Sequence, residues 1–394
     1  MIGTALLDYN VLTLNKIAAC GTDLLDKSKY TVSDDEKNPD AILVRSASMH
    51  EMELPANLLA IARAGAGVNN IPIDKCTEKG VVVFNTPGAN ANAVKELVIA
   101  GLLLSSRKIP AAMDWIKTLK GKGDEVGKLV EKGKSQFVGP EIMGKKLGVI
   151  GLGAIGILVA NAAAELGMDV YGADPYLSVE NALKLSGKVH YVKSNKEIFE
   201  KCDYITLHVP ALPDTKGMIN AEAIASMKKT VRLLNFARDT LVDEKAIIDA
   251  LANGGMACYV TDFATDGLIG LDGVVAMPHL GASTPESEDN CAVMAVREIV
   301  DYIENGNIRN SVNLPNVEMA ISGNAKICVI HKNAEGLLNN ITAPVSAAGL
   351  NIENMVSKSK KDYAYTCLDV KGDASGIEAA IKAVSGVVSV RVIK

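Results

Sequence analysis

Three glycines, Gly151, Gly153 and Gly156, form the pattern G-x-G-x-x-G where the apolar run Leu147–Ile150 ends. The pattern predicts a strand, a tight turn and a helix over Ile157–Leu166. The first glycine permits the turn, the second lets the backbone approach a pyrophosphate, and the third lets the helix pack closely on the strand. The free N–H groups and positive dipole end of that helix would attract phosphates. These residues therefore predict a dinucleotide-binding turn.

An acidic residue closes the next strand of this βαβ unit. The apolar run Met168–Gly172 follows the helix and leads to Asp174, which stands 18 residues after Gly156 (174 − 156). A carboxylate there would accept hydrogen bonds from the ribose hydroxyls of adenosine and would repel a 2′-phosphate. The unit as a whole indicates NAD rather than NADP.

His279 and Arg238 are candidates for hydride-transfer chemistry. Oxidation of a 2-hydroxy acid needs, besides the nicotinamide, an acid/base for the hydroxyl proton, a cation for the carboxylate and a carboxylate that tunes the base. His279 lies in PHLGAST after one expected strand, and Arg238 lies in LLNFARDT after another, so both are expected at the same sheet edge. His50 and His190 occupy polar, surface-like segments, and His208 falls in a strand-like run where a structural role is favoured.

Two arginines end expected strands nearer the N-terminus. Arg45 follows the run AILV, and Arg63 stands in ARAGAG. Two guanidinium groups could bind a phosphate or carboxylate bidentately. On the residues alone, ordinary surface ion pairs are the more common explanation.

The composition of the 394-residue chain excludes several classes of function. It is 48% hydrophobic and 22% charged with a net charge of −5, so there is no global basic field for nucleic acid or an anionic membrane. Its seven cysteines are scattered and never form C-x-x-C, which predicts reduced thiols without disulfides or a zinc site. The N-terminus lacks the basic region of a leader, and no apolar run is long enough for a membrane span. We therefore expect a cytoplasmic protein without a metal.

The alternation of apolar runs and helical stretches predicts an α/β protein with parallel, doubly wound sheets. The expected strands are Ala41–Val44, Leu58–Ala64, Val81–Phe84, Cys202–Val209, Val231–Asn235, Met256–Thr261 and Val274–Ala276. The expected helices are Val94–Ser106, Glu244–Asn253 and Pro285–Glu304, and Lys117–Lys134 is expected to be a solvated loop or surface helix. Leu314–Ala325 is the predicted linker. The last segment should fold as βαββαβ, a ferredoxin-like layout, over Lys326–His331, Glu335–Ala348, Leu350–Val356, Tyr363–Val370, Ser375–Val384 and Val387–Ile393.

Six motifs together resemble the D-isomer-specific 2-hydroxyacid dehydrogenases: VRSAS, IARAGAGVNNI, NTPGANANAVKELV, GVIGLGAIG, LLNFARDTLVDE and PHLGAST. The resemblance runs nearly end to end, is strongest to members that oxidise 3-phospho-D-glycerate in serine biosynthesis, and includes a C-terminal unit similar to an ACT domain. It implies a substrate-binding domain over residues 1–96 and 286–318, an NAD-binding Rossmann domain over 97–285, and an ACT regulatory domain over 323–394.

The resemblance also implies roles for individual residues. It makes Arg238 and His279 catalytic. The family's acid is usually a glutamate, and here either Gly267 or Asp266 occupies that position, depending on the alignment; we favour Asp266, whose shorter side chain would stabilise the imidazolium less. The implied cofactor contacts are Gly151, Gly153, Ala154, Ile155, Gly156, Asp174, Val209, Pro210, Phe236, Ala237, Asp262, Gly281 and Ala282. The implied substrate contacts are Arg45, Ser46, Arg63, Gly65 and Asn90, and the implied contacts of an L-serine effector are His331, Asn333 and Asn351.

The resemblance leads us to expect NAD-dependent oxidation of 3-phospho-D-glycerate to 3-phosphooxypyruvate, regulated by serine. The apolar Val94–Ser106 helix and the C-terminal unit lead us to expect a homodimer or homotetramer. Two alternatives stay open. One is a dehydrogenase of another D-2-hydroxy acid, such as glycerate or 4-phosphoerythronate. The other is an NAD-sensing binding protein with little turnover, for which the altered acid is the only support. For the C-terminal unit, a dimerisation module without a ligand is the alternative to a serine sensor.

Overall fold

The computed structural model describes residues 9–394, so the first eight residues of the expected substrate-binding domain lie outside the described residues. The chain divides into two compact units. The first combines Met1–Asn90 with Pro285–Lys394, and the second is Ala91–Thr284. The first unit is therefore built from both ends of the chain.

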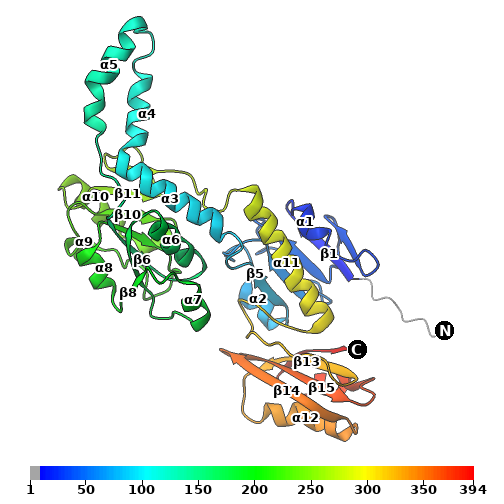
Figure 1. Cartoon of the computed structure of the whole chain (residues 1–394). Helices are drawn as coiled ribbons and strands as arrows, with labels where there is room; N and C mark the ends of the chain where they lie inside the picture. Colours follow the sequence, from blue (N-terminus) through cyan, green and yellow to red (C-terminus); the bar gives the residue numbers. More distant parts are fainter. Residues whose placement is uncertain (1–8) are drawn as a thin grey trace. The chain divides into compact units, whose positions relative to one another are not determined.

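The first unit contains a five-stranded parallel sheet in the order β2-β1-β3-β4-β5. Helices α1 and α11 pack on one face of this sheet, and α2 lies on the other (Figure 1). The elements are β1 (Tyr9–Leu14), α1 (Ala19–Thr22), β2 (Tyr30–Ser33), β3 (Ala41–Val44), β4 (Ala60–Arg63), α2 (Ile73–Glu78), β5 (Val82–Asn85) and α11 (Pro285–Asn305).

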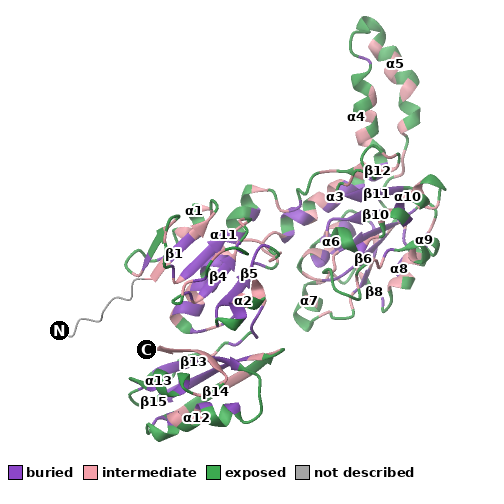
Figure 2. Ribbon diagram, turned by 180° about the vertical axis from the view of Figure 1, so that it is seen from behind, coloured by how far each residue is buried: buried purple, intermediate pink, exposed green. Residues whose placement is uncertain are grey.

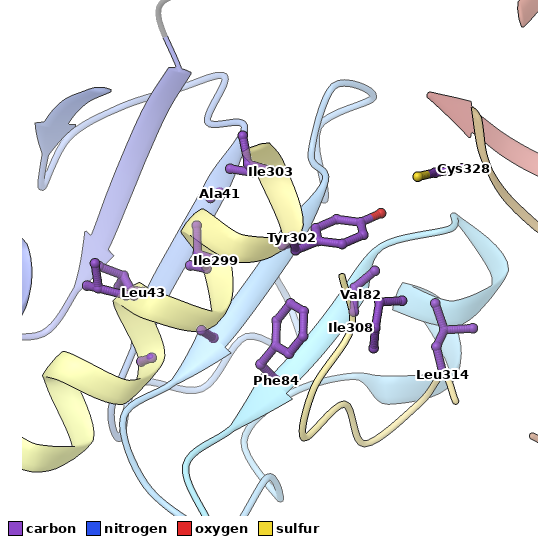
Figure 3. Packing of buried hydrophobic residues seen from close by; sticks show 14 of the residues in the cluster. Ala41, Leu43, Val82, Phe84, Ile299, Tyr302, Ile303, Ile308, Leu314 and Cys328 are labelled. Carbon is purple, nitrogen blue, oxygen red and sulfur yellow. The ribbon is translucent and has the colours of Figure 1, made fainter. Parts of the chain in front are cut away.

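The central strand β3 of this sheet is buried on both faces. All four residues of β3 are fully buried, as expected for a run of apolar side chains covered by helices on each side. On the α11 face, Phe84 packs against Tyr302 with ring centroids 5.9 Å apart, and Ile299 and Ile303 continue the same core (Figure 3). This core fixes the strand ends from which Arg45 and Arg63 emerge.

The second unit contains a seven-stranded parallel sheet in the order β12-β11-β10-β9-β6-β7-β8. This is a doubly wound Rossmann arrangement whose strand order reverses between β6 and β9. The expected α/β class is confirmed. The sheet strands are β6 (Lys146–Ile150), β7 (Asp169–Ala173), β8 (His190–Tyr191), β9 (Tyr204–Leu207), β10 (Arg232–Asn235), β11 (Cys258–Thr261) and β12 (Val274–Ala276). The main helices are α3 (Ala91–Arg107), α6 (Ala154–Glu165), α7 (Val179–Lys184), α8 (Asn195–Lys201), α9 (Ala221–Ala225) and α10 (Glu244–Ala252).

A helical hairpin projects from the second unit where a solvated loop or surface helix was expected (Figure 1). It comprises α4 (Ile109–Lys117), η1 (Gly123–Glu125), α5 (Val126–Gly133) and η2 (Lys134–Phe137). Neither α4 nor α5 has a buried residue, and Figure 2 shows these two helices in the colours of exposed and intermediate residues. The rings of Trp115 and Phe137, 5.3 Å apart, join its two arms.

The C-terminal segment of the first unit folds in the expected order βαββαβ. Its antiparallel sheet has the strand order β14-β15-β13-β16. The elements are β13 (Ala325–Lys332), α12 (Leu337–Ala347), β14 (Asn351–Lys360), β15 (Tyr363–Lys371), α13 (Ile377–Lys382) and β16 (Val387–Ile393). One face of the sheet packs on α12 and α13, and Cys328 and Tyr365 on the other face join the core around Tyr302.

The segment Leu314–Ala325, expected to be a linker, is packed into the first unit. Leu314 and Val317 are buried in its core, and Val317 pairs with Ile308 in an isolated antiparallel bridge. The Nζ of Lys326, a fully buried residue, donates hydrogen bonds to Asn305, Asn307 and Met319. The proline and glycine that suggested a linker mark turns but do not show what packs on them, and the linker role of this segment stays a prediction.

Candidate active site

The glycine-rich turn after β6 has the backbone geometry that a pyrophosphate site requires. Gly151 has φ +94°, and a Cβ there would lie 2.6 Å from the carbonyl oxygen of His208. A Cβ on Gly156 would overlap the carbonyl oxygen of Gly151, so only glycine lets α6 begin this close to the turn. A Cβ on Gly153 would meet no described atom within 4 Å. The turn is thus closed on the protein side and open on the side where a ligand would lie.

Helix α6 begins at Ala154 and Ile155 with Gly153 as its N-cap, and no described side chain caps it. Its first N–H groups therefore remain available for the phosphates of a dinucleotide. Asp174 follows β7 and accepts hydrogen bonds from the N–H groups of Leu152 (2.9 Å) and Tyr176 (2.8 Å). These bonds hold its half-buried carboxylate beside the turn, where ribose hydroxyls would be recognised. The turn, the helix and Asp174 fit NAD.

Three adjacent parallel strands of the second unit carry the candidate catalytic groups just beyond their carboxyl ends. Arg238 follows β10, Asp262 follows β11 and His279 follows β12. Because the strands are parallel neighbours, these loops share one edge of the sheet, as the sequence predicted for Arg238 and His279. The exposed guanidinium of Arg238 donates to the carbonyl of Ala237 at 2.6 Å, and the exposed ring of His279 lies 4.9 Å from that of Phe263.

Asp262 is the buried charge of this group, with 2% of its surface exposed. Its Oδ2 accepts a hydrogen bond from Gly281 N–H at 3.3 Å, and its Oδ1 is buried without a partner among the described residues. Burial raises the pKa of Asp262, while the nearby His279, the Gly281 N–H and Arg238 act in the opposite direction. An unpartnered buried oxygen of this kind fits the expectation that Asp262 contacts the cofactor, where it would accept a hydrogen bond from the nicotinamide carboxamide.

Asp266 lies four residues further along the same loop, and its side chain is exposed. No hydrogen bond or ion pair joins it to His279 within the part of the chain that the structure describes. Among the influences on the pKa of Asp262 is the nearby charge of His279, which lowers it, so the structure links the buried Asp262 carboxylate to His279. Sequence patterns did not favour Asp262 as the partner of His279, because only the fold shows that β11 lies beside β12.

The remaining expected cofactor residues surround the same strand ends. Val209 and Pro210 follow β9, and Val209 is close to the Gly151 turn. The side chain of Phe236 is buried against α3, so Phe236 and Ala237 would contact a ligand through their backbone. Gly281 is buried beside Asp262 and Ala282 is half-buried.

His208 directly follows β9 and is not assigned to catalysis. Its Nε2 lies 3.0 Å from the Thr206 hydroxyl, and burial lowers the pKa of His208 to about 3. It is therefore neutral at neutral pH, in keeping with the structural role expected for it.

In the first unit, Arg45 and Arg63 occupy the carboxyl ends of neighbouring strands, β3 and β4. The Arg63 Nε donates to the carbonyl of Arg45 at 2.8 Å, and its Nη1 donates to Gly67. The Nη2 of Arg45 pairs with Glu288 in the first turn of α11 at 2.5 Å. The Arg63 guanidinium therefore binds the main chain of Arg45 and Gly67, and the Arg45 guanidinium already holds a carboxylate.

The loop after β3 is braced by a residue that sequence reasoning missed. Asn15 has φ +71°, and its Oδ1 accepts hydrogen bonds from the N–H groups of Ser46 (2.9 Å) and Ala47 (2.7 Å). The available signal was the asparagine itself, since this residue type tolerates positive φ. Of the other expected substrate contacts, Ser46 is exposed, and Gly65 and Asn90 are half-buried.

The three expected effector residues differ in accessibility. Asn333 and Asn351 are exposed, and their side chains donate to the Lys361 carbonyl at 3.2 Å and to Glu353 at 2.7 Å. His331 is buried, with Nδ1 2.7 Å from the Lys332 carbonyl and Nε2 2.8 Å from the Thr366 hydroxyl. A carbonyl can only accept, so Nδ1 carries a proton, and burial lowers the pKa of His331. Both ring nitrogens are therefore already engaged.

No described helix is both long enough and apolar enough to cross a membrane. The described residues also contain no group of three or more histidine, cysteine or acidic side chains placed to hold a metal ion.

Comparison with known proteins identifies relatives over most of the chain. Residues 99–281 match the NAD-binding domain of the D-isomer specific 2-hydroxyacid dehydrogenases. The chain is 32% identical to D-3-phosphoglycerate dehydrogenase of Haemophilus influenzae, covering 96% of this chain and 94% of the relative. It is also 32% identical to the enzyme of the same name from Escherichia coli, covering 84% and 79%. The solved structure of NAD+-bound 3-phosphoglycerate dehydrogenase from Entamoeba histolytica is similar, with a TM-score of 0.61, 27% identity, and coverage of 78% of this chain and 99% of that chain. The chain therefore belongs to the family of D-isomer-specific 2-hydroxyacid dehydrogenases and binds NAD.

Proposed function

We propose that this chain catalyses the NAD-dependent oxidation of 3-phospho-D-glycerate to 3-phosphooxypyruvate, the first step of phosphorylated serine biosynthesis. The observation that carries the proposal is the row of strand ends at which Arg238, Asp262 and His279 follow β10, β11 and β12. It supplies the cation, the buried carboxylate and the base that the reaction needs. Relatives named for this substrate, similar over nearly the whole chain, support the choice within the family.

The chemistry assigned to the residues follows from their types. Arg238 binds the substrate carboxylate and draws electron density from the adjacent C2 centre. His279 accepts the proton as the C2–O–H bond breaks and the C2=O bond forms. NAD, when bound, takes the hydride from C2. Asp262 or Asp266 stabilises the imidazolium that results.

We assign Arg45 and Arg63 to the phosphate of the substrate, with Ser46, Gly65 and Asn90 completing the contacts. Substitution of Arg45 by alanine should raise KM for 3-phosphooxypyruvate much more than for hydroxypyruvate, which lacks the phosphate. Equal effects on the two substrates would instead favour a dehydrogenase of an unphosphorylated 2-hydroxy acid.

We further propose that the protein is a cytoplasmic homo-oligomer. Its substrate domain would comprise residues 1–96 and 286–318, and its NAD domain residues 97–285. We propose that residues 323–394 act as an ACT-type serine sensor. The βαββαβ order and the exposure of Asn333 and Asn351 support the sensor. Binding through His331 would require its present hydrogen bonds to be exchanged. Serine should slow the wild type and not Asn351→Ala, while Asn339→Ala, an exposed asparagine on α12, should remain sensitive.

The decisive measurement is initial NADH oxidation with 3-phosphooxypyruvate beside hydroxypyruvate, each with and without L-serine. We expect a strong preference for the phosphorylated compound that serine suppresses. The exposed position of Asp266, without a bond to His279, is the observation behind the alternative of an NAD-sensing protein. That alternative predicts NADH binding without turnover of either compound.

A further inference from the structure

A polar hollow of about 470 Å³ opens in the first unit, and none of the residues assigned above to substrate or serine lines it. It lies where the end of β5, the segment after α11 and the end of β14 meet. The polar groups around it come from Asn85, Asn310, Ser311, Asn316, Lys358, Ser359 and Lys360. Its volume is in the range of sites that hold a small metabolite.

The charge of the lining is one-sided. Two lysines, Lys358 and Lys360, contribute ammonium groups, and none of the described residues that line the hollow is acidic. The surrounding amides and hydroxyls can donate further hydrogen bonds. The chain as a whole has a net charge of −5, whereas this hollow has two cations and no acidic lining residue. Its local charge therefore favours binding of an anion.

Lys360 is the better anchored of the two cations. Its half-buried side chain donates from Nζ to the Ser311 carbonyl at 3.0 Å, which directs the ammonium toward the segment after α11. An ammonium has three donors, so two remain for a ligand. Burial lowers the pKa of Lys360, with Lys361 acting in the same direction, and an anion would offset both effects.

The floor of the hollow is fixed before any ligand arrives. Asn310, with φ +54°, donates from Nδ2 to Glu298 of α11 at 2.8 Å, and its carbonyl accepts from the Asn85 N–H at 3.4 Å. Ser311 pairs with Phe84 of β5 in an isolated antiparallel bridge. The contacts hold the segment after α11 against the end of β5, so donors on both are preorganised.

We propose that this hollow is a binding site for a phosphoryl dianion, held chiefly by Lys358 and Lys360 with the amides of Asn85 and Asn310. Each lysine ammonium acts as a point charge, so two lysines suit a compact dianion. The volume exceeds what inorganic phosphate alone needs, so a small phosphorylated metabolite fits better than the free ion. The site lies at the opposite end of β14 from Asn351, and the binding itself does not depend on the proposed catalytic function.

The ligand would connect two parts of the first unit. On one side it contacts the end of β14 in the C-terminal sheet, and on the other it contacts Asn85, directly before the Thr86–Asn90 segment that ends with a proposed substrate contact. Occupancy would therefore stabilise the packing of the C-terminal sheet against the β5 end. This gives the site a readout in thermal stability as well as in binding.

The test is calorimetric titration of the full chain with glycerol 3-phosphate, inorganic phosphate and glycerol. We expect the phosphoryl compounds to bind and glycerol not to bind, and expect Lys358→Gln/Lys360→Gln to weaken binding at least about tenfold. The matched control Lys193→Gln/Lys371→Gln removes the same charge from exposed lysines elsewhere and should bind like the wild type. Arg45→Ala should also retain this binding event, which separates it from the proposed substrate phosphate site.

A second variant tests the site in case the double lysine variant does not fold. Asn316→Asp places a carboxylate on the rim of the hollow at an exposed position and should weaken binding without removing a lysine. Glycerol 3-phosphate should raise the melting temperature of the wild type and of the control, and not that of either hollow variant. Binding of glycerol 3-phosphate and not of inorganic phosphate identifies a phosphorylated metabolite as the source, whereas binding of both shows that the free ion suffices. Equal affinity in the wild type and both hollow variants, or no binding at all, would overturn the proposal.

Discussion

The buried carboxylate of Asp369 accepts hydrogen bonds from both the backbone N–H and the hydroxyl of Ser322. Gly323 N–H (2.9 Å) and the Asn354 amide (3.2 Å) donate to the same carboxylate. Asp369 thereby fastens the segment before β13 to β15. Burial alone would raise the pKa of Asp369, but these donors outweigh it and hold the pKa at about 2.

We predict that Asp369→Asn destabilises the protein by about 2 kcal/mol at neutral pH, because an amide replaces a carboxylate that accepts several hydrogen bonds. Denaturant unfolding followed by far-UV circular dichroism measures this. A carboxyl whose folded pKa is depressed contributes stability that is present above its ordinary pKa and lost as pH falls toward 2. The wild type should thus lose its advantage over the variant between about pH 4 and pH 2.

The matched control is Asp373→Asn, because Asp373 is exposed and bonds only to Ser375 nearby in sequence. It should cost less than about 0.5 kcal/mol. An Asp369→Asn protein as stable as this control at neutral pH would show that the cluster does not hold the segment.

The pKa of Glu298, on α11, is shifted in the opposite direction from that of Asp369. Glu298 is buried, its Oε1 accepts from Asn310, and its Oε2 has no partner among the described residues. Burial raises the pKa of Glu298 to about 8, with the Asn310 hydrogen bond acting against it. Between its ordinary pKa and pH 8 the folded state holds a proton that the unfolded state has released, so stability falls as pH rises through this window.

We predict that Glu298→Gln flattens this decline, because glutamine keeps an acceptor for Asn310 and cannot ionise. A single proton contributes at most about 1.4 kcal/mol per pH unit to the slope. Unfolding free energies measured from pH 5 to pH 9 give the comparison, with exposed Glu286→Gln as the control. A parallel decline in wild type and Glu298→Gln would mean that Glu298 is ionised throughout.

The sequence predicted those parts of the fold that depend on local patterns. Ala41–Val44 and Val274–Ala276 are strands with the predicted limits, because apolar runs bounded by polar residues leave little choice of strand ends. The glycine pattern was equally informative. The positive φ at Gly151 and the close backbone approach at Gly156 each require a glycine at one position, and such a position can be recognised in the sequence. Both the α/β class and the NAD cofactor were correctly predicted.

Long-range partners could not be predicted. Arg45 and Glu288 are 243 positions apart in sequence, and only the packing of α11 on the sheet brings them together. Lys326 looked like an ordinary strand residue, yet its ammonium is buried and satisfied by carbonyls and an amide from the segments around it. In the same way, no sequence pattern shows that His331 has both ring nitrogens engaged.

The Arg45–Glu288 pair gives a kinetic prediction. Both side chains are 42% exposed, so the pair contributes little to stability, but Glu288 competes with a substrate phosphate for the guanidinium. Glu288→Gln should therefore lower KM for 3-phosphooxypyruvate by up to about fivefold, the equivalent of an exposed ion pair. Hydroxypyruvate should be unaffected, and Glu286→Gln in the same helical turn serves as the control. Unchanged KM values in Glu288→Gln would argue against a phosphate role for Arg45.

The choice between Asp262 and Asp266 as the carboxylate that supports His279 can be settled by pH–rate profiles. A carboxylate near an imidazole stabilises the imidazolium, so its removal should move the acidic limb of kcat/KM for oxidation to lower pH. From its burial and its electrostatic interaction with His279 we predict this shift for Asp262→Asn, together with at least about a tenfold loss of kcat. Asp266→Asn, at an exposed position, should keep the wild-type profile.

NADH affinity measured by fluorescence separates the two functions of Asp262, because loss of the carboxamide contact alone would weaken cofactor binding without moving the acidic limb of the pH–rate profile. A shifted limb in Asp266→Asn, with Asp262→Asn unshifted, would return the role to Asp266 and imply that its loop moves toward His279 when substrate binds.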